Sequence, residues 1–489
     1  MLSILIGHSY FQRFDRKQVE RAKPYPPLAT LQVAALLRGQ GRRVAFFDAM
    51  LAQGPEAFEA QLGLERPALV LFYEDNYNFL TKMCLGRMRE ACLTMIGRAR
   101  AQGARVIAAG SDVSDTPGVY LRAGADVVLR GEGLEELQAL LTRLDAQPDA
   151  PAAQLADGLG AAGWAHNGAV RWGDAGGQPV RVRTPASAHA SIQAEAAWDL
   201  VDMPTYRAVW TQAHGRFSLN MAASKGCSFR CAWCAKPIWG QRYLQRAPEA
   251  VAAEMLALKQ RAAPDHVWFA DDIFGFRADW VRRFADVLAQ GGGGVPFTIQ
   301  TRADLVSDAM ADALAQAGCA EAWIGAESGS QQVLDAMDKG TTVDEIEQTR
   351  ERLRARGVRV GFFIQLGYLG EDLDELLATR ALIERAQPDD IGVSVAYPLP
   401  GTRFYEQVRE QLGAKTHWDD SADLAMMFRG TFSSEFYRGF RDLLHEEVRI
   451  ATARAANGQR LAWEALQQRW NTLIAAAPEH RTATVVPAT

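Results

Sequence analysis

The feature that most constrains the fold is a repeated alternation of short apolar runs with amphipathic segments, found in two separate stretches of the chain. In residues 1–145 the apolar runs are nearly continuous, as is typical of strands buried on both faces of a parallel sheet. We therefore predict an N-terminal α/β domain with a doubly wound, Rossmann-like parallel sheet. Ligands of such sheets bind at the carboxyl ends of the strands.

The second stretch, residues 216–405, repeats the pattern through six strand–helix units, which predicts a partial (β/α)6 TIM barrel. Between the two stretches, residues 146–215 are rich in Ala, Gly, Asp and Pro and contain an Asn-Gly turn, so we expect a linker with a small hairpin. Residues 406–489 carry apolar side chains at helical spacing, which predicts a helical C-terminal domain with a disordered tail.

Charge and hydropathy exclude several classes of function. The net charge of −5 and the pI of about 6.0 leave no basic field for nucleic acid. No apolar run reaches the roughly 18 residues of a membrane-spanning helix, and the first residues lack the features of a signal peptide. We therefore expect a cytoplasmic protein without a membrane span.

Three of the six cysteines lie close together in the string SKGCSFRCAWCAKP, at Cys227, Cys231 and Cys234. Thiolates at this spacing can hold an iron–sulfur cluster, and three protein ligands leave one iron open to a substrate or cofactor. Structural zinc is the alternative, but closed zinc sites need four ligands. His214 lies on the far side of a predicted strand and Cys319 is remote, so the pattern favours a cluster.

This loop, with Trp233 just before the last cysteine, resembles the radical S-adenosylmethionine (SAM) superfamily. The resemblance implies that the three cysteines hold a catalytic [4Fe–4S] cluster. It also implies that the open iron binds SAM, which is cleaved reductively to a 5′-deoxyadenosyl radical. By the same resemblance, a reduced flavodoxin or ferredoxin donates the electron.

The resemblance continues at later strand ends and implies the SAM contacts. The expected residues are Asp271 and Asp272 for the amino group, Arg302 at the next strand end, Glu327 and Ser328 beside Gly325 for the ribose, and Gly367 with Gly370 near the adenine. Each has an alternative from the residues alone. Asp271 could cap the following helix, and Arg302 could form a surface ion pair. Glu327 ends an apolar strand, so its carboxylate needs a partner.

The N-terminal domain resembles the cobalamin-binding domain that precedes many radical SAM cores. Small residues at strand ends let a macrocycle approach the backbone, and the resemblance implies cobalamin contacts at Gly110, Ser111, Gly131, Glu132 and Gly133. The DxHxxG loop of cobalamin mutases is absent, so cobalamin would bind without a His on cobalt. The alternative is that these glycines only turn the chain and the domain binds nothing.

The closest resemblance is to the subgroup of cobalamin-dependent radical SAM methyltransferases and the anaerobic magnesium-protoporphyrin IX monomethyl ester cyclase. It implies methylation, via methylcobalamin, of an unactivated carbon in a small-molecule substrate such as a natural product or lipid-like compound. One alternative is a radical oxidative cyclisation like that of the cyclase. Another is a non-catalytic cobalamin or iron–sulfur sensor, although the sequence shows no output module.

Overall fold

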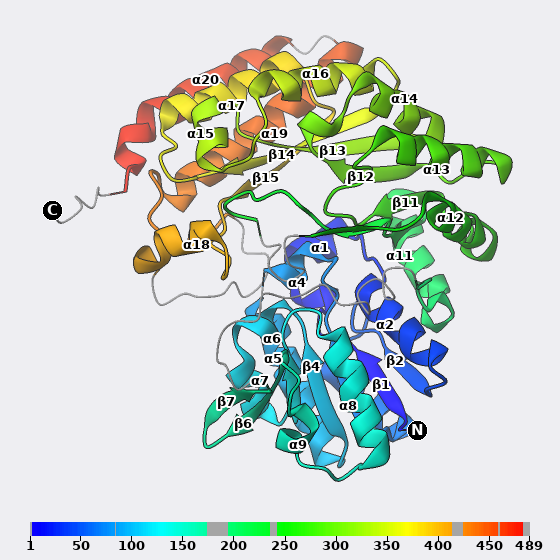
Figure 1. Cartoon of the computed structure of the whole chain (residues 1–489). Helices are drawn as coiled ribbons and strands as arrows, with labels where there is room; N and C mark the ends of the chain where they lie inside the picture. Colours follow the sequence, from blue (N-terminus) through cyan, green and yellow to red (C-terminus); the bar gives the residue numbers. More distant parts are fainter. Residues whose placement is uncertain are drawn as a thin grey trace. The chain divides into compact units, whose positions relative to one another are not determined.

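The computed structural model describes residues 2–83, 85–173, 194–234, 242–412, 424–457 and 460–482. Cys84, residues 174–193 of the predicted linker and residues 483–489 of the predicted disordered tail lie outside these residues. The described chain forms two compact units, residues 2–228 with 242–272, and residues 229–234 with 273–412 and most of 424–482. Figure 1 shows the elements of both units.

The first unit contains the predicted doubly wound sheet. Its strands are β1 (Ile4–Gly7), β2 (Val44–Phe47), β3 (Leu69–Tyr73), β4 (Arg105–Ala109) and β5 (Val127–Leu129). All neighbouring pairs among them are parallel, in the order β2-β1-β3-β4-β5. This order reverses between β1 and β3, and ligands of doubly wound sheets bind at such a reversal.

Alternate residues of each strand enter different cores. Leu69 and Leu71 pack with helices α2 (Leu28–Gly39) and α8 (Leu134–Ala146) on one face of the sheet. Val70 and Phe72 pack with α3 (Pro55–Glu65), α5 (Gly86–Ala101) and α7 (Pro117–Ala123) on the other. The nearly continuous apolar character of the strands therefore follows from burial on both faces.

One predicted element of this domain is wrong. The sequence predicts a single helix from residue 81 to 103, whereas the structure has a short α4 (Phe79–Lys82) and a separate α5. The Asn78 side chain caps α4 by accepting from Leu80 N at 3.0 Å. Leu85 has an extended backbone, with φ −64° and ψ 134°, which interrupts the helix. The second helix, α5, begins at the next residue, Gly86.

The Asn-Gly turn forms the predicted hairpin, between β6 (Ala162–His166) and β7 (Ala169–Trp172). Asn167 and Gly168 both have positive φ, at 50° and 77°, as a two-residue primed turn requires. Strand β6 pairs antiparallel with β5, so the hairpin extends the sheet to seven strands and is not confined to a linker.

The second strand series consists of the six predicted strands. In the first unit, β8 (Ser218–Met221) and β11 (His266–Phe269) pair in parallel. In the second, β12 (Phe297–Thr301), β13 (Cys319–Glu327), β14 (Arg359–Leu366) and β15 (Asp390–Val395) pair in parallel in that order. The helices between them are α12 (Pro248–Ala262), α13 (Ala278–Gln290), α14 (Asp308–Ala317), α16 (Val343–Arg354) and α17 (Leu373–Ala386).

The C-terminal region is helical, as predicted, with α19 (Ser434–Asn457) and α20 (Arg460–Ala476) packed against each other. Phe440 of α19 meets Trp470 of α20 edge to face, with ring centroids 4.9 Å apart. Arg380 of α17 lies over the Trp470 ring and pairs with Glu447 at 2.9 Å, which fixes these helices to the second unit. Among the described residues, no helix is both long and apolar enough to cross a membrane.

Candidate active site

The cysteine loop follows a short hairpin strand, β9 (Ser224–Gly226), which pairs antiparallel with β10 (Tyr243–Gln245). Cys227 is buried, whereas Cys231 and Cys234 are half-buried and joined by a turn from Cys234 N to Cys231 O at 3.4 Å. Within the described residues, no three His, Cys, Asp or Glu side chains are grouped closely enough to hold a metal ion. The set of three soft thiol donors suits an iron–sulfur cluster, and their role as its ligands stays a prediction.

Backbone hydrogen bonds hold the second half of this loop in the second unit. Ala232 N donates to Met337 O at 2.8 Å, and Phe404 N donates to Ala232 O at 2.9 Å. Next to it, Trp233 packs against an apolar cluster that includes Tyr368 and Phe404. The Trp233 ring nitrogen is buried and has no hydrogen-bond partner among the residues described. The N–H and the C=O of Ala232 therefore attach the loop to the segments at Met337 and Phe404.

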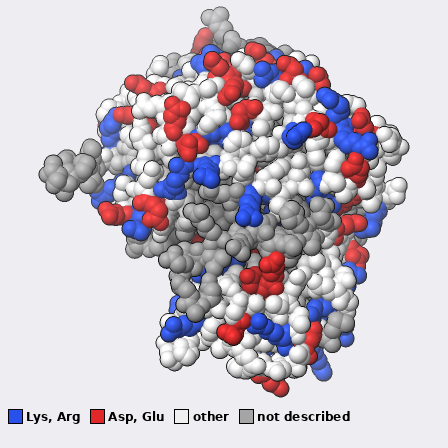
Figure 2. All heavy atoms as spheres, in the orientation of Figure 1, with Lys and Arg blue, Asp and Glu red and all other residues white. Residues whose placement is uncertain are grey.

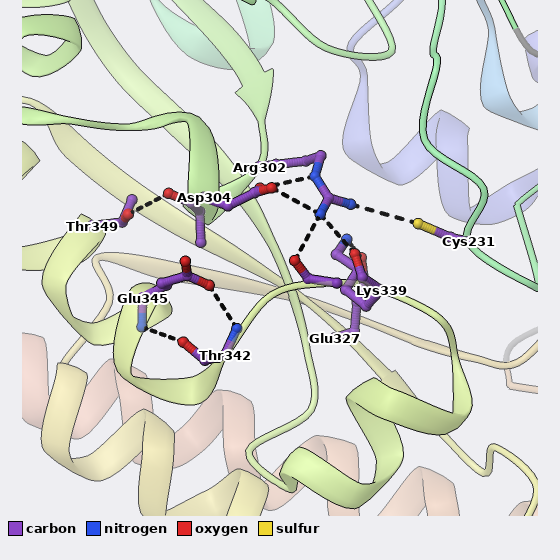
Figure 3. A network of polar contacts seen from close by, with 10 residues as sticks. Cys231, Arg302, Asp304, Glu327, Lys339, Thr342, Glu345 and Thr349 are labelled. Atoms are coloured by element: carbon purple, nitrogen blue, oxygen red, sulfur yellow. Dashed lines mark hydrogen bonds and ion pairs between the residues drawn. The ribbon is translucent and has the colours of Figure 1, made fainter.

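Arg302, Glu327 and Lys339 form a buried polar network beside Cys231 (Figure 3). Lys339 Nζ donates to Glu327 Oε1 at 2.7 Å, so the carboxylate at the end of β13 has the partner that its burial requires. Arg302 Nη2 donates to Lys339 O at 2.6 Å, and Nη1 donates to Cys231 Sγ at 3.6 Å. Because Arg302 is 4% exposed, the alternative of a surface ion pair is wrong.

The end of β13 is irregular in a way that serves this network. The register with β14 shifts between Gly325 and Glu327, and Glu327 has a φ of 62°, which is uncommon for a residue with a side chain. Ser328 is fully buried, and its hydroxyl pairs with Thr379 Oγ1 at 3.1 Å and accepts from Ser330 N at 3.1 Å. These bonds fix the turn after β13, whereas contact of Ser328 with a ligand stays a prediction.

We expect Gly325→Ala to destabilise the protein by about 1–3 kcal/mol, because the new methyl group would displace the ends of two buried, paired side chains. A Cβ at Gly325 would lie 2.6 Å from Lys339 Nζ and 2.8 Å from Glu327 Oε1, which would separate the ion pair. The control is Gly97→Ala in α5, where nothing lies within 4 Å of the new Cβ. Urea unfolding of both variants tests this, and equal midpoints would contradict it.

The turn after β14 places Gly367 over a buried carboxyl group. Gly367 has a φ of 77°, and its N–H donates to Glu371 Oε2. The positive φ favours glycine, and a Cβ there would lie in tight contact with Met426 and Tyr437, at 3.1 Å from each. Gly370 has a φ of 82° and open space around it. Contact of this turn with adenine stays a prediction.

Glu371 was not anticipated from the sequence, although it directly follows the glycine turn. Its side chain is fully buried, and burial raises its pKa to about 8. Lys339 was also missed, because its partner Glu327 is 12 residues away in the chain and no local pattern joins them. The signal for Glu371 was its position in LGYLGE, where a carboxylate can accept the N–H groups of the turn.

We expect Glu371→Gln to make stability less dependent on pH. Between pH 5 and 8 the folded chain keeps a proton on Glu371 that the unfolded chain, with a pKa near 4.5, has released. The free energy of unfolding therefore falls as pH rises through this window, by up to ~1.4 kcal/mol per pH unit from this group. Unfolding midpoints at pH 5 and 8 test this, and an unchanged slope in the variant would contradict it.

In the first unit, Asp271 lies directly after β11 and is fully buried. It accepts from Ala223 N at 3.0 Å and from the Ser224 hydroxyl, and burial raises its pKa to about 7. The next helix, α13, begins at Ala278, so Asp271 does not cap it and that alternative is wrong. Asp272 is half-buried beside it. Asp271 therefore fixes the start of β9, the strand before Cys227. Contact of Asp271 and Asp272 with SAM stays a prediction.

The carboxyl edge of the first sheet carries the residues predicted for cobalamin. Gly110 follows β4 with a φ of 157°, and its missing Cβ leaves space that Glu74 fills, since that Cβ would lie 2.7 Å from Glu74 Cγ. The close approach at Gly110 is thus made by Glu74. Ser111 Oγ donates to Asn76 Oδ1 at 3.3 Å.

Glu74, at the end of β3, was not predicted as a site residue from the sequence. Its Oε2 accepts from Ser9 N at 3.1 Å, which joins the ends of β3 and β1 at the reversal of strand order. Burial raises the pKa of Glu74, and its Oε1 has no hydrogen-bond partner within the described ranges. A buried carboxyl oxygen without a partner fits a ligand with amide donors, and cobalamin carries such groups.

The turn after β5 also connects to the cysteine hairpin within the first unit. Gly131 N donates to Ser114 Oγ at 2.9 Å, and Gly133 has a φ of 55° at the start of α8. The carboxylate of Glu132, between them, forms a buried ion pair with Lys225 of β9. A predicted cobalamin contact is therefore paired with a residue two positions before Cys227, a contact that no local pattern indicated.

A model described as the Radical SAM superfamily matches residues 221–383, so the chain contains a radical SAM domain. A protein described as an uncharacterized methyltransferase from Pyrococcus horikoshii is 27% identical over 62% of this chain and 62% of its own length. The anaerobic magnesium-protoporphyrin IX monomethyl ester cyclase of Cereibacter sphaeroides is 25% identical over 59% of this chain and 45% of its own. The matches thus span about half to two thirds of these relatives.

The similarity to solved structures extends beyond the radical SAM domain. The structure of the radical SAM methyltransferase TsrM from Kitasatospora setae, with cobalamin and a [4Fe–4S] cluster bound, matches with a TM-score of 0.67 and 16% identity. The match covers 97% of this chain and 99% of TsrM. The predicted order of folds, a Rossmann-like domain, a partial TIM barrel and a helical region, is therefore confirmed.

Proposed function

We propose that this chain is a cobalamin-dependent radical SAM enzyme that methylates an unactivated carbon of a small-molecule substrate. The observation that carries the proposal is the Cys227–Cys234 loop inside a radical SAM domain, within a fold that matches the cobalamin-bound radical SAM methyltransferase TsrM over 97% of the chain. When bound, the cluster and SAM would supply a carbon-centred radical, and cobalamin would supply the methyl group.

The residues of the chain would hold these groups as follows. Cys227, Cys231 and Cys234 would ligate the cluster through thiolates. The paired Glu327 carboxylate at the end of β13 is fixed in position by Lys339 and could accept hydrogen bonds from ribose hydroxyls. Carboxyl ends of parallel barrel strands are where active sites of such barrels form, and Glu327 lies at the end of such a strand.

The N-terminal domain supports the cobalamin part of the proposal. Glu74 offers a buried, unpaired carboxyl oxygen at the reversal of strand order, among the described residues. Gly131 and Gly133 provide positive φ in the turn after β5, at the same edge of the sheet and separated from β3 by β4. We propose that the corrin ring or its amide side chains lie along this edge, with a reduced flavodoxin or ferredoxin as electron donor and the cytoplasm as compartment.

A second candidate is a radical oxidative cyclisation, which the similarity to the magnesium-protoporphyrin cyclase favours. The two reactions differ in what they make from SAM. Methyl transfer consumes one SAM as methyl donor, giving S-adenosylhomocysteine, and a second as radical source, giving 5′-deoxyadenosine. Cyclisation gives 5′-deoxyadenosine alone.

The test is anaerobic reconstitution of the full chain with iron, sulfide and hydroxocobalamin, followed by incubation with SAM and dithionite. We expect both S-adenosylhomocysteine and 5′-deoxyadenosine by mass spectrometry. 5′-Deoxyadenosine without S-adenosylhomocysteine would favour cyclisation. Neither product from a chain carrying both cofactors would overturn the enzymatic proposal and favour the sensor hypothesis.

A further inference from the structure

The contacts of Arg302 point away from a simple role in binding SAM. Its Nε donates to Asp304 Oδ1 at 2.9 Å, and its Nη2 donates to Asp304 Oδ2 at 3.1 Å and to Lys339 O at 2.6 Å. Its remaining nitrogen, Nη1, donates to Cys231 Sγ at 3.6 Å. Each of the three guanidinium nitrogens thus has a protein partner, and Figure 3 shows Nη1 aimed at the sulfur.

The guanidinium is also held in place by an aromatic ring from the cysteine loop itself. The Arg302 Cζ atom lies 3.7 Å from the centroid of the Phe229 ring, which is cation–π distance. Arg302 therefore contacts the loop twice, at Phe229 and at Cys231, and all of these residues belong to the second unit. A cation in a buried position acts more strongly on a neighbouring charge than it would in water.

We infer that Arg302 is a positioning residue that raises the reduction potential of the cluster by donating a hydrogen bond and a positive charge to the Cys231 sulfur. The inference rests on the proposed function, because it requires a cluster on Cys231. Reduction adds one electron to an already anionic cluster–thiolate assembly, so a buried cation stabilises the reduced form more than the oxidised form. Hydrogen bonds to cluster sulfurs and net charge are established determinants of such potentials.

Four variants separate charge, hydrogen bonding and structure. Arg302→Met removes the charge and the donors, whereas Arg302→Gln removes the charge and keeps donor groups. Arg302→Lys keeps the charge without the planar fork. Asp304→Asn removes the carboxylate that partly neutralises Arg302. The control is Arg350→Met, which removes another buried Arg of the same unit, one that donates to Gln387 O at 2.8 Å and pairs with Asp389 at 3.3 Å.

The measurement is the midpoint potential of the cluster in the reconstituted full chain, by redox titration followed by electron paramagnetic resonance, without SAM. We expect a shift to more negative potential in Arg302→Met and Arg302→Gln, and partial recovery in Arg302→Lys. Asp304→Asn should shift the potential in the opposite direction, and Arg350→Met should leave it unchanged. General damage to the fold does not produce shifts of opposite sign.

Failure of the inference and failure of the proposed function are distinguishable. If the wild-type chain assembles no cluster, the proposed function fails. If wild type and variants assemble the cluster with one common potential, the inference alone is overturned. A difference in potential that arises only after SAM is added also overturns it, and makes Arg302 a SAM contact instead.

Discussion

Replacing Cys231 with alanine is expected to remove the cluster and to abolish formation of 5′-deoxyadenosine from SAM. With one of three thiolates lost, two protein ligands remain at a site that needs three, so the reconstituted variant should contain little iron or sulfide. The thiol is half-buried, so the metal-free variant should unfold at nearly the same denaturant concentration as metal-free wild type. A large loss of cluster without loss of stability is the signature of a ligand.

The matched control is Cys319→Ala. Cys319 is also a free cysteine, buried at the start of β13, and its thiol donates to Glu321 O at 3.4 Å. Burial raises the pKa of this thiol, so it stays protonated and is a poor metal ligand. Cys319→Ala should keep the iron content and the 5′-deoxyadenosine yield of wild type. If Cys231→Ala also keeps them, the assignment of the cluster loop is wrong.

Lys225→Met is expected to destabilise the first unit by about 3–5 kcal/mol, because it leaves the Glu132 carboxylate buried without its counter-charge. The Lys225 and Glu132 side chains are each 4% exposed, and Glu132 lies in the turn after β5 that we propose holds cobalamin. Loss of the pair should therefore weaken retention of hydroxocobalamin as well as stability. Urea unfolding of the metal-free chain and the cobalamin content after desalting measure the two effects.

Two further variants control for this prediction. The double variant Lys225→Met/Glu132→Leu removes both charges, so it should regain most of the stability while cobalamin retention stays low. Arg277→Met breaks an ion pair with Asp279 whose side chains are 73% and 61% exposed, and should leave the urea midpoint nearly unchanged because water screens the pair. Equal destabilisation by Lys225→Met and Arg277→Met would contradict the buried-pair account.

Periodicity in the sequence was sufficient to predict both parallel strand series and the C-terminal helices, because apolar spacing reports directly on burial. Boundaries were less predictable. The helix expected from residue 81 is broken at Leu85, whose extended backbone the helical spacing of the apolar residues does not indicate. The Asn167–Gly168 turn was predictable, but its antiparallel addition to β5 depends on residues distant in the chain.

The residues of the candidate site also differ in whether the sequence alone could predict them. Cys227, Cys231 and Cys234 could be proposed from the sequence because their spacing is local, whereas Lys339, Lys225 and Glu74 pair with residues that only the fold brings near. Ser328 and Gly110 illustrate the converse. Both stand at predicted strand ends, yet the Ser328 hydroxyl is used inside the protein, and the space beside Gly110 is filled by Glu74.

The central claim is that one chain holds both an iron–sulfur cluster and cobalamin. The most direct test is the content of iron, sulfide and cobalamin in a single anaerobically reconstituted and desalted sample of the full chain. We predict iron and sulfide in equal amounts, at the level of one [4Fe–4S] cluster per chain, together with one cobalamin per chain. A cluster without retained cobalamin would contradict the methyltransferase account, and absence of the cluster would contradict the account as a whole.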